Sequence, residues 1–284
     1  MNNDRIQEIL DLMEEARLDY FLISDPQSIA YCTGYYNDPH ERMFVFMISK
    51  HGNHTLFMND LFYLEHDLDV NIVWHKDGQD AIQTIVDEMH FPGRIGIDKN
   101  WASHFLLDLM KKLPDAKYIN ASPCVDLVRM KKDLQEQVLM IESSKINDAV
   151  MEEIIPFIQE GVTEKQLAKK LDELFFNHHS TCYGAIVAFG KNAADPHHEN
   201  DDTPLRKGDC VLIDMGCVYK GYCSDMTRTF FYEGILEEEI KVYGISDYVI
   251  GDIQQKATVL LGYANLSEEE IRESVKILCR IWSA

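Results

Sequence analysis

The chain has 284 residues, of which 46% are apolar and 10% aromatic. A chain of this length and composition can bury hydrophobic cores, is not disordered, and predicts about two domains. Its 27 basic and 48 acidic residues give a formal net charge of −21, which repels phosphate backbones and argues against nucleic-acid binding as a main function. The same charge favours bound cations.

The cysteines and the apolar runs indicate the compartment. Seven cysteines are an odd number, which argues against a disulfide framework. Cys210, Cys217 and Cys223 are too far apart for a Cys-x-x-Cys metal motif and lie in apolar, strand-like sequence, so we expect small core residues in a reducing compartment. The start carries no apolar signal region and no apolar run reaches about 18 residues, so we expect a cytoplasmic protein without a membrane segment.

Helix and strand patterns alternate along residues 1–128. An opening helix places apolar residues on one face, namely Ile6, Ile9, Leu10, Leu12 and Met13. The pattern then predicts strands at residues 20–23, 43–48, 54–58, 72–74 and 95–97, and helices at about 80–89 and 106–110. Such alternation predicts an α/β layer domain.

Residues 131–233 change to two helices followed by strands, which predicts an α+β domain. The first helix runs from Leu134 to about Gln159, and Pro156 either ends it early or kinks it. Thr163 caps the second helix with Gln166 three residues later. The apolar stripe of this second helix is Leu167, Leu171, Leu174 and Phe175, and the expected strands are 185–189, 210–214 and 222–231.

Two aspartates carry the clearest chemical signal. Asp214 ends an apolar run, so we expect a carboxylate that a buried strand carries inward and that needs a cation, a proton or strong donors. Asp225 lies on the next strand, and a hairpin would bring both carboxylates to one side of the sheet. Such a pair suits Mn²⁺, Co²⁺, Zn²⁺ or Fe²⁺. The alternative is a turn aspartate before Gly216 together with an Asp–Arg228 ion pair.

Two histidine pairs need separate interpretations. Asp195-Pro-His-His-Glu forms a polar loop before the strand with Asp214, and adjacent histidines in such a loop are commonly only solvated. His178-His179 has no acidic strand beside it, so we interpret that pair as the end of a helix.

Three ordered segments together resemble the prolidase/creatinase family of metallopeptidases, in its Xaa-Pro dipeptidase and aminopeptidase branch. They are Pro196-His-His, Lys207-Gly-Asp-x-Val-Leu-Ile-Asp-x-Gly and Gly221-Tyr-x-Ser-Asp-x-Thr-Arg-Thr-Phe. The resemblance covers about residues 1–233. It implies an α/β creatinase-type amino-terminal domain over 1–128 and the first half of an α+β pita-bread domain over 131–233.

The resemblance also implies a site. Two divalent ions activate a shared water, with Asp214 as a ligand of one ion and Asp225 bridging both. His197 stabilises the tetrahedral intermediate, and Thr227 orients carboxylate oxygens. The implied substrate is an Xaa-Pro dipeptide or a short peptide.

A loop in the first domain is a second candidate for substrate contact. The resemblance implies a homodimer in which Asp38, His40 and Arg42 of one subunit border the cleft of its partner. The alternative is a surface loop with a local Glu–Arg pair.

The sequence also departs from the family. The family pattern requires a further histidine and two glutamates on later strands. No histidine follows His198 and only 59 residues (284 − 225) follow Asp225, so we expect three of the five ligands to be absent. Residues 235–284 instead resemble the carboxyl-terminal end of a pyridoxal-phosphate aminotransferase-like protein, a short unrelated α/β tail. This tail carries no cofactor lysine motif, so no pyridoxal phosphate is expected, and Ser267 with Glu270 predicts its last helix.

Three functions remain open on the sequence. The chain is a working Xaa-Pro dipeptidase, a non-catalytic peptide-binding module, or a gene-fusion remnant without function. Because three ligands are absent, we expect weak metal binding and little or no turnover.

Overall fold

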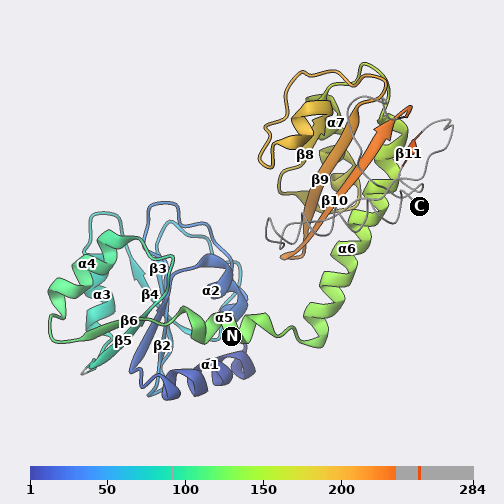
Figure 1. The fold of residues 1–284 in the computed structure, drawn as a ribbon. Coiled ribbons are helices and arrows are strands. Elements are labelled where there is room, and N and C mark those ends of the chain that lie inside the picture. Colours follow the sequence, from blue (N-terminus) through green and yellow to red (C-terminus); the bar gives the residue numbers. More distant parts are fainter. Residues whose placement is uncertain (91, 235–248, 251–284) are drawn as a thin grey trace, which may run out of the picture. The chain divides into compact units, whose positions relative to one another are not determined.

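The computed structural model describes residues 1–90, 92–234, 249 and 250, and it divides into two units (Figure 1). The first unit is Met1–Lys132, and the second begins at Asp133. Apart from Val249 and Ile250, the tail over residues 235–284 and its expected helix after Ser267 lie outside the described residues.

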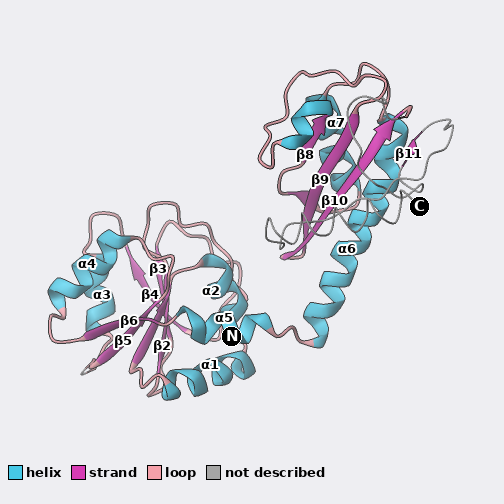
Figure 2. Ribbon diagram, viewed as in Figure 1, coloured by secondary structure: helices cyan, strands magenta, loops and turns pink. Residues whose placement is uncertain are grey.

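A six-stranded sheet in the order β4-β3-β2-β1-β5-β6 forms the centre of the first unit (Figure 2). β1 (Tyr20–Ile23) lies between β2 (Val45–Ser49), which is antiparallel to it, and β5 (Arg94–Ile97), which is parallel. The remaining strands are β3 (Thr55–Asn59), β4 (Asn71–His75) and β6 (Lys117–Asn120). Each strand predicted for this region is confirmed, whereas β6 was not predicted.

Helices cover both faces of this sheet (Figure 1). One face carries α1 (Asn3–Glu15), α2 (Pro26–Thr33) and α5 (Ser122–Met130), and the other carries α3 (Ala81–Asp87) and α4 (Ser103–Lys112). Because both faces are covered, the central strands are buried on both sides and therefore read as continuous apolar runs. The predicted α/β layer architecture is confirmed.

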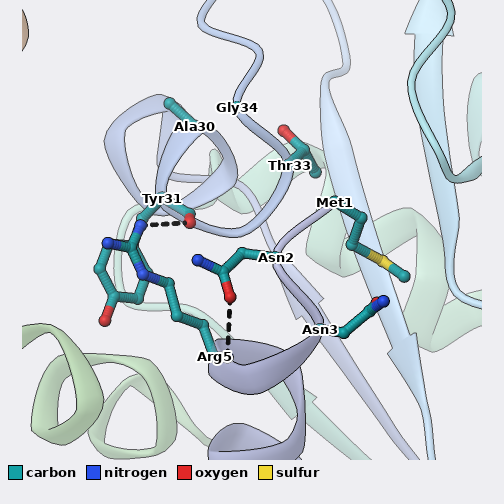
Figure 3. Close-up of a pocket in the computed structure, with 8 residues that line it drawn as sticks. All are labelled: Met1, Asn2, Asn3, Arg5, Ala30, Tyr31, Thr33 and Gly34. Carbon is teal, nitrogen blue, oxygen red and sulfur yellow. Dashed lines mark hydrogen bonds between the residues drawn. The ribbon is translucent and has the colours of Figure 1, made fainter. Parts of the chain in front are cut away.

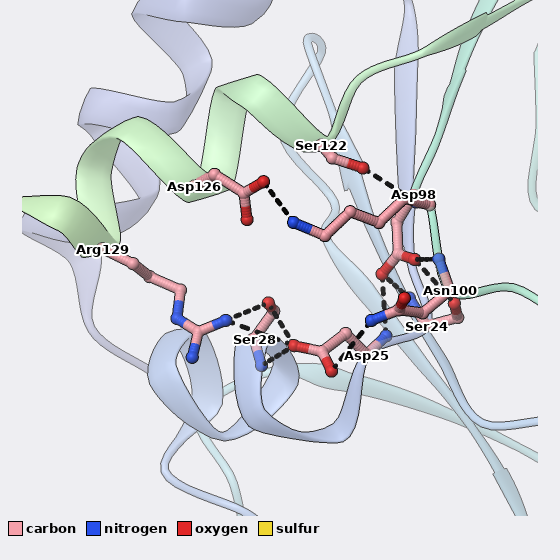
Figure 4. Close-up of polar contacts among 9 residues, drawn as sticks. Ser24, Asp25, Ser28, Asp98, Asn100, Ser122, Asp126 and Arg129 are labelled. Carbon is pink, nitrogen blue, oxygen red and sulfur yellow. Dashed lines mark hydrogen bonds and ion pairs between the residues drawn. The ribbon is translucent and has the colours of Figure 1, made fainter. Parts of the chain in front are cut away.

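Asp98 joins the carboxyl ends of two neighbouring parallel strands (Figure 4). It follows β5 directly and is only 5% exposed. Its Oδ2 accepts hydrogen bonds from the backbone N–H groups of Ser24 at 2.9 Å and Asp25 at 2.7 Å, both just after β1. A backbone donor also comes from Asn100, at 2.5 Å from Oδ1. The carboxylate thus satisfies three backbone donors where helical connections leave the sheet.

Replacing this carboxylate should destabilise the first unit. In Asp98→Ala three backbone N–H groups lose their acceptor, and we expect the free energy of unfolding to fall by about 3 kcal/mol. Urea denaturation followed by circular dichroism measures the loss. Asp108→Ala is the matched control, because Asp108 is 52% exposed and pairs with Lys111 on the surface of its own helix. Equal stability of the two variants would contradict this account.

The second unit packs two helices against one face of a sheet. The helices are α6 (Leu134–Ile154) and α7 (Glu164–Asn177), with a short 3₁₀ helix η1 (Ile155–Phe157) between them. Pro156 lies in η1, so it belongs to the end of the first helix and does not kink it. The capping box of Thr163 with Gln166 and the buried apolar stripe of α7 are confirmed.

Two long antiparallel strands, β9 (Cys210–Tyr219) and β10 (Tyr222–Tyr232), form the centre of this sheet. The short strands around them are β7 (Thr181–Cys182) and β8 (Ile186–Phe189), both paired with β9, and β11 (Val249–Ile250), paired with β10. A 3₁₀ helix, η2 (Gly190–Ala194), follows β8. None of the helices in the described ranges offers the long apolar stretch that a membrane crossing requires.

The alternation of side chains along β9 and β10 differs from two expectations, one on Asp214 and one on the cysteines. Along β9 the side chains that enter the core are Val211, Ile213, Met215 and Cys217. Asp214 therefore points to the opposite face and is half-buried, so the expectation that it is carried inward was wrong. Cys223 is exposed and Cys210 only half-buried, so of the three cysteines only Cys217 is a buried core residue. An apolar run is not enough to show that both faces of a strand are covered.

Candidate active site

The register of the β9–β10 hairpin brings the predicted metal-site residues to one face of the sheet. Asp214 lies directly opposite Thr227, and Gly216 lies directly opposite Asp225. Residues opposite each other in an antiparallel pair share a face, and so do residues two positions apart. Asp214 and Asp225 are therefore diagonal neighbours, with Cα atoms about 7–8 Å apart in a regular pair. This face is the one turned away from the apolar core.

Thr227 orients the first carboxylate. Its Oγ1 donates a hydrogen bond of 2.7 Å to Asp214 Oδ1. Among the described residues no donor contacts the other oxygen of Asp214, which can serve a cation on the same face. Arg228 donates to the carbonyl of Thr227, and within residues 1–90 and 92–234 it forms no ion pair with either aspartate. The alternative of an Asp–Arg228 pair is thus not seen among the described residues.

Gly216 makes room for a tyrosine beside the second carboxylate. A Cβ atom built on Gly216 would lie 2.2 Å from Tyr183 Oη, so a larger residue would displace the ring. The Tyr183 hydroxyl donates a hydrogen bond of 2.8 Å to the carbonyl of Ser224. Burial, followed by the charge of Asp225, raises the pKa of Tyr183, which keeps the phenol protonated beside the carboxylates. Tyr183 was not predicted, because no sequence motif links it to the hairpin.

His197 lies in the loop between η2 and β9, and its side chain is exposed. Its N–H donates to Asp195 Oδ1 at 3.1 Å, and the N–H of His198 donates to the carbonyl of Asp195 at 3.3 Å. The two histidines thus belong to one tight turn. His178 and His179 follow α7 as expected, and His178 contacts Glu153 at 2.9 Å.

A second group of potential ligands surrounds the beginning of α7. Oxygen or nitrogen atoms of Glu164, His198 and Asp201 all lie within 4.8 Å of one another. The carboxylate of Glu164 is fully buried, and His198 Nε2 lies 2.6 Å from its Oε2. Oε2 also accepts the N–H of Asp201 at 3.0 Å, and Oε1 accepts the N–H of Phe189 at 2.9 Å. Protein donors therefore already occupy both oxygens.

The loop of Asp38, His40 and Arg42 lies in the first unit. Arg42 forms a two-point ion pair with Asp77, with Nε–Oδ1 at 3.0 Å and Nη2–Oδ2 at 2.9 Å, and a further pair with Glu41 at 2.9 Å. Asp38 and His40 are exposed. The local Glu–Arg pair of the alternative interpretation is thus present, while a role in a partner's site stays a prediction.

Two cavities in the first unit are lined by other residues. The larger has a volume of about 500 Å³ and lies between the start of α1 and the end of α2 (Figure 3). On its wall Arg5 donates to the carbonyl of Tyr31 at 3.0 Å and lies 3.9 Å from the centre of that ring. The smaller cavity has a volume of about 230 Å³. It is lined by Asp98 and by Arg129, whose guanidinium pairs with Asp25 (Figure 4). Neither cavity includes a residue of the β9–β10 hairpin.

Known proteins match both units of the chain. A family model for the Creatinase/Prolidase N-terminal domain matches residues 5–131, and one for Metallopeptidase family M24 matches residues 138–249. A dipeptidase structure from Pyrococcus horikoshii OT3 is 31% identical with a TM-score of 0.73, over 82% of this chain and 67% of that one. A prolidase structure from Thermococcus sibiricus is 26% identical with a TM-score of 0.76, over 84% and 67%. An uncharacterized peptidase of Staphylococcus aureus is 27% identical over 85% of this chain and 70% of its own length.

The chain belongs to the prolidase/creatinase family of metallopeptidases. Its fold is a creatinase-type amino-terminal domain followed by pita-bread structure, as the motifs predicted. The second family match continues to residue 249, past residue 233, where we expected the resemblance to end.

The family implies a divalent metal cofactor, and the hairpin fits one. Asp214 and Asp225 present hard carboxylate donors on the same open face, and Thr227 holds one of them in place. The cluster at Glu164 fits a metal less well, because a metal there would have to displace N–H donors from a fully buried carboxylate.

Removing the hydroxyl of Thr227 should weaken metal binding. In Thr227→Val the Asp214 carboxylate loses its orienting donor, and we expect the dissociation constant for Mn²⁺ to rise about 10-fold. Electron paramagnetic resonance of free Mn²⁺ measures this constant. Thr229→Val is the matched control. Thr229 lies on the same strand as Thr227, but its partner across the hairpin is Leu212 and not Asp214. Equal constants for the two variants would show that Thr227 does not orient a metal ligand.

Proposed function

We propose that this chain forms a prolidase-type hydrolase site that recognises Xaa-Pro dipeptides or short peptides and binds Mn²⁺, Co²⁺ or Zn²⁺. The observation that carries the proposal is the placement of Asp214 and Asp225 on one face of the β9–β10 hairpin, with Thr227 bonded to Asp214. Relatives that are named dipeptidase and prolidase support the substrate class.

Each residue has a separate task in this proposal. The bound metal supplies Lewis-acid polarisation and lowers the pKa of water. Asp214 and Asp225 offer the oxygens that hold it, and Thr227 keeps Asp214 in one orientation. His197 donates a hydrogen bond to the oxygen on which negative charge develops as the peptide carbonyl is attacked.

We infer that the 284-residue polypeptide alone turns over slowly. Its sequence has no histidine after His198, so the two aspartates have no imidazole partner from later strands. The alternative is a non-catalytic peptide-binding module. It also rests on the lack of a histidine after His198, because peptide contacts do not require a complete metal site. Binding without hydrolysis would favour that alternative.

The proposal also covers the cellular compartment and the oligomeric state of the protein. We place the protein in the cytoplasm, a reducing compartment, since all six described cysteines are free thiols. In a homodimer, the loop with Asp38 and His40 would border the partner's cleft. A structure of the dimer with bound dipeptide tests this, and a loop that faces solvent away from both sites would contradict it.

With added Mn²⁺, Co²⁺ or Zn²⁺, we expect the purified 284-residue chain to hydrolyse Xaa-Pro dipeptides many orders of magnitude more slowly than a complete two-metal site, because positioning and Lewis-acid assistance each contribute several kcal/mol. A coupled assay for released proline measures the rate. The control is the double variant Asp214→Ala, Asp225→Ala. Rapid turnover that disappears in this control would overturn the prediction of a weak site.

A further inference from the structure

We propose that Glu164 is a positioning residue for His197, because its buried carboxylate holds both ends of the segment from His198 to Asp201. The inference rests on the proposed function only in the role given to His197. The contacts of Glu164 are independent of that role. They join three parts of the second unit, namely the start of α7, the end of β8 and the loop that carries the histidines.

The first step is the connection of Glu164 to the loop. Oε2 contacts His198 Nε2 at 2.6 Å and the N–H of Asp201 at 3.0 Å. Oε1 contacts the N–H of Phe189 at 2.9 Å and Asn192 Nδ2 at 3.0 Å. Because all four contacts end on one fully buried carboxylate, the loop cannot shift without breaking buried hydrogen bonds.

The second step leads from His198 to His197. The two residues are consecutive, and both of their N–H groups bond to Asp195, one to its side chain and one to its carbonyl. Fixing the His198 ring therefore fixes the turn from which the His197 side chain projects. His197 itself is exposed, so this turn limits where its imidazole can lie.

The third step links the loop to the metal-site hairpin. Asn200 Oδ1 accepts the N–H of Val187 at 2.7 Å, and Asn200 Nδ2 donates to the carbonyl of Ala185 at 2.7 Å. Ile186, between these two residues, pairs directly with Asp214 across β8 and β9. The loop is thus attached to the strand position beside the first carboxylate, only three residues from His197.

The charge of His198 supports this arrangement. Its side chain is 12% exposed, and the hydrogen bond to Glu164 raises its pKa above the ordinary value of 6.5, with smaller contributions from Asp201 and Asp195. A raised pKa means that the folded state binds this proton more tightly than the unfolded state. The resulting stabilisation is fully present below about pH 6.5 and is lost as pH rises through the raised pKa.

The test uses Glu164→Gln in the full chain. Glutamine has the same shape but no charge, so we expect the pKa of His198, measured by NMR titration, to fall toward its ordinary value. We expect the Asp201 amide to exchange about 10-fold faster with solvent, and the affinity for an Xaa-Pro dipeptide to fall about 10-fold. When dipeptide affinity is plotted against pH, the midpoint that reports the titration of His198 should move to lower pH. Glu199→Gln is the matched control, an exposed glutamate in the same loop.

The outcomes separate this inference from the proposed function. If neither the unchanged chain nor Glu164→Gln binds dipeptide, the proposed function fails. The NMR titration of His198 and the exchange of the Asp201 amide then still decide the role of Glu164. In Glu164→Gln, an unchanged exchange rate of the Asp201 amide together with an unchanged pKa of His198 overturns the proposal. If that variant does not fold, His198→Gln removes the contact between the histidine and the carboxylate while the three other donors stay. Unchanged dipeptide affinity in His198→Gln then overturns the proposal.

Discussion

The antiparallel pairing of β9 with β10 is the constraint on which the rest of the second unit depends. The pairing fixes which residues share a face, and it sends Ile213 and Met215 into the core while Asp214 and Asp225 point the other way. A shift by one residue would turn one of the two strands over, so that one carboxylate would face the apolar core and the two aspartates would no longer share a face. The apolar packing of α6 and α7 on one face therefore also specifies the metal-binding face.

Hydrophobic periodicity predicted most of the fold, because the elements carry strong local signals. The stripe of α7, the capping box at Thr163 and the apolar strands of the first unit follow from contacts within one element or from burial on both faces. The expectations that Asp214 is carried inward and that Cys223 is a core residue were wrong for the same reason. An apolar run does not reveal which faces of a strand are covered, since that depends on helices distant in the chain.

The site was predictable where motif spacing determines geometry and not where distant segments meet. Asp214, Asp225 and Thr227 lie on one hairpin, so the sequence order of the motif already sets their neighbourhood. Glu164 and Tyr183 reach the site through the tertiary fold. In the sequence Glu164 is an ordinary acidic residue in the first turn of a helix, which its dipole alone would explain. Only the folded chain brings His198, 34 residues away, against its carboxylate.

Among the residues that the structure describes, two groups of side chains offer metal ligands, and we expect the metal at only one of them. Crystals of the chain grown with Mn²⁺, with diffraction measured at a wavelength where manganese scatters anomalously, test this directly. The account predicts an anomalous peak between the carboxylates of Asp214 and Asp225. It predicts no such peak among Glu164, His198 and Asp201, where hydrogen bonds already occupy the carboxylate of Glu164. A peak at that cluster, with none on the β9–β10 face, would contradict it.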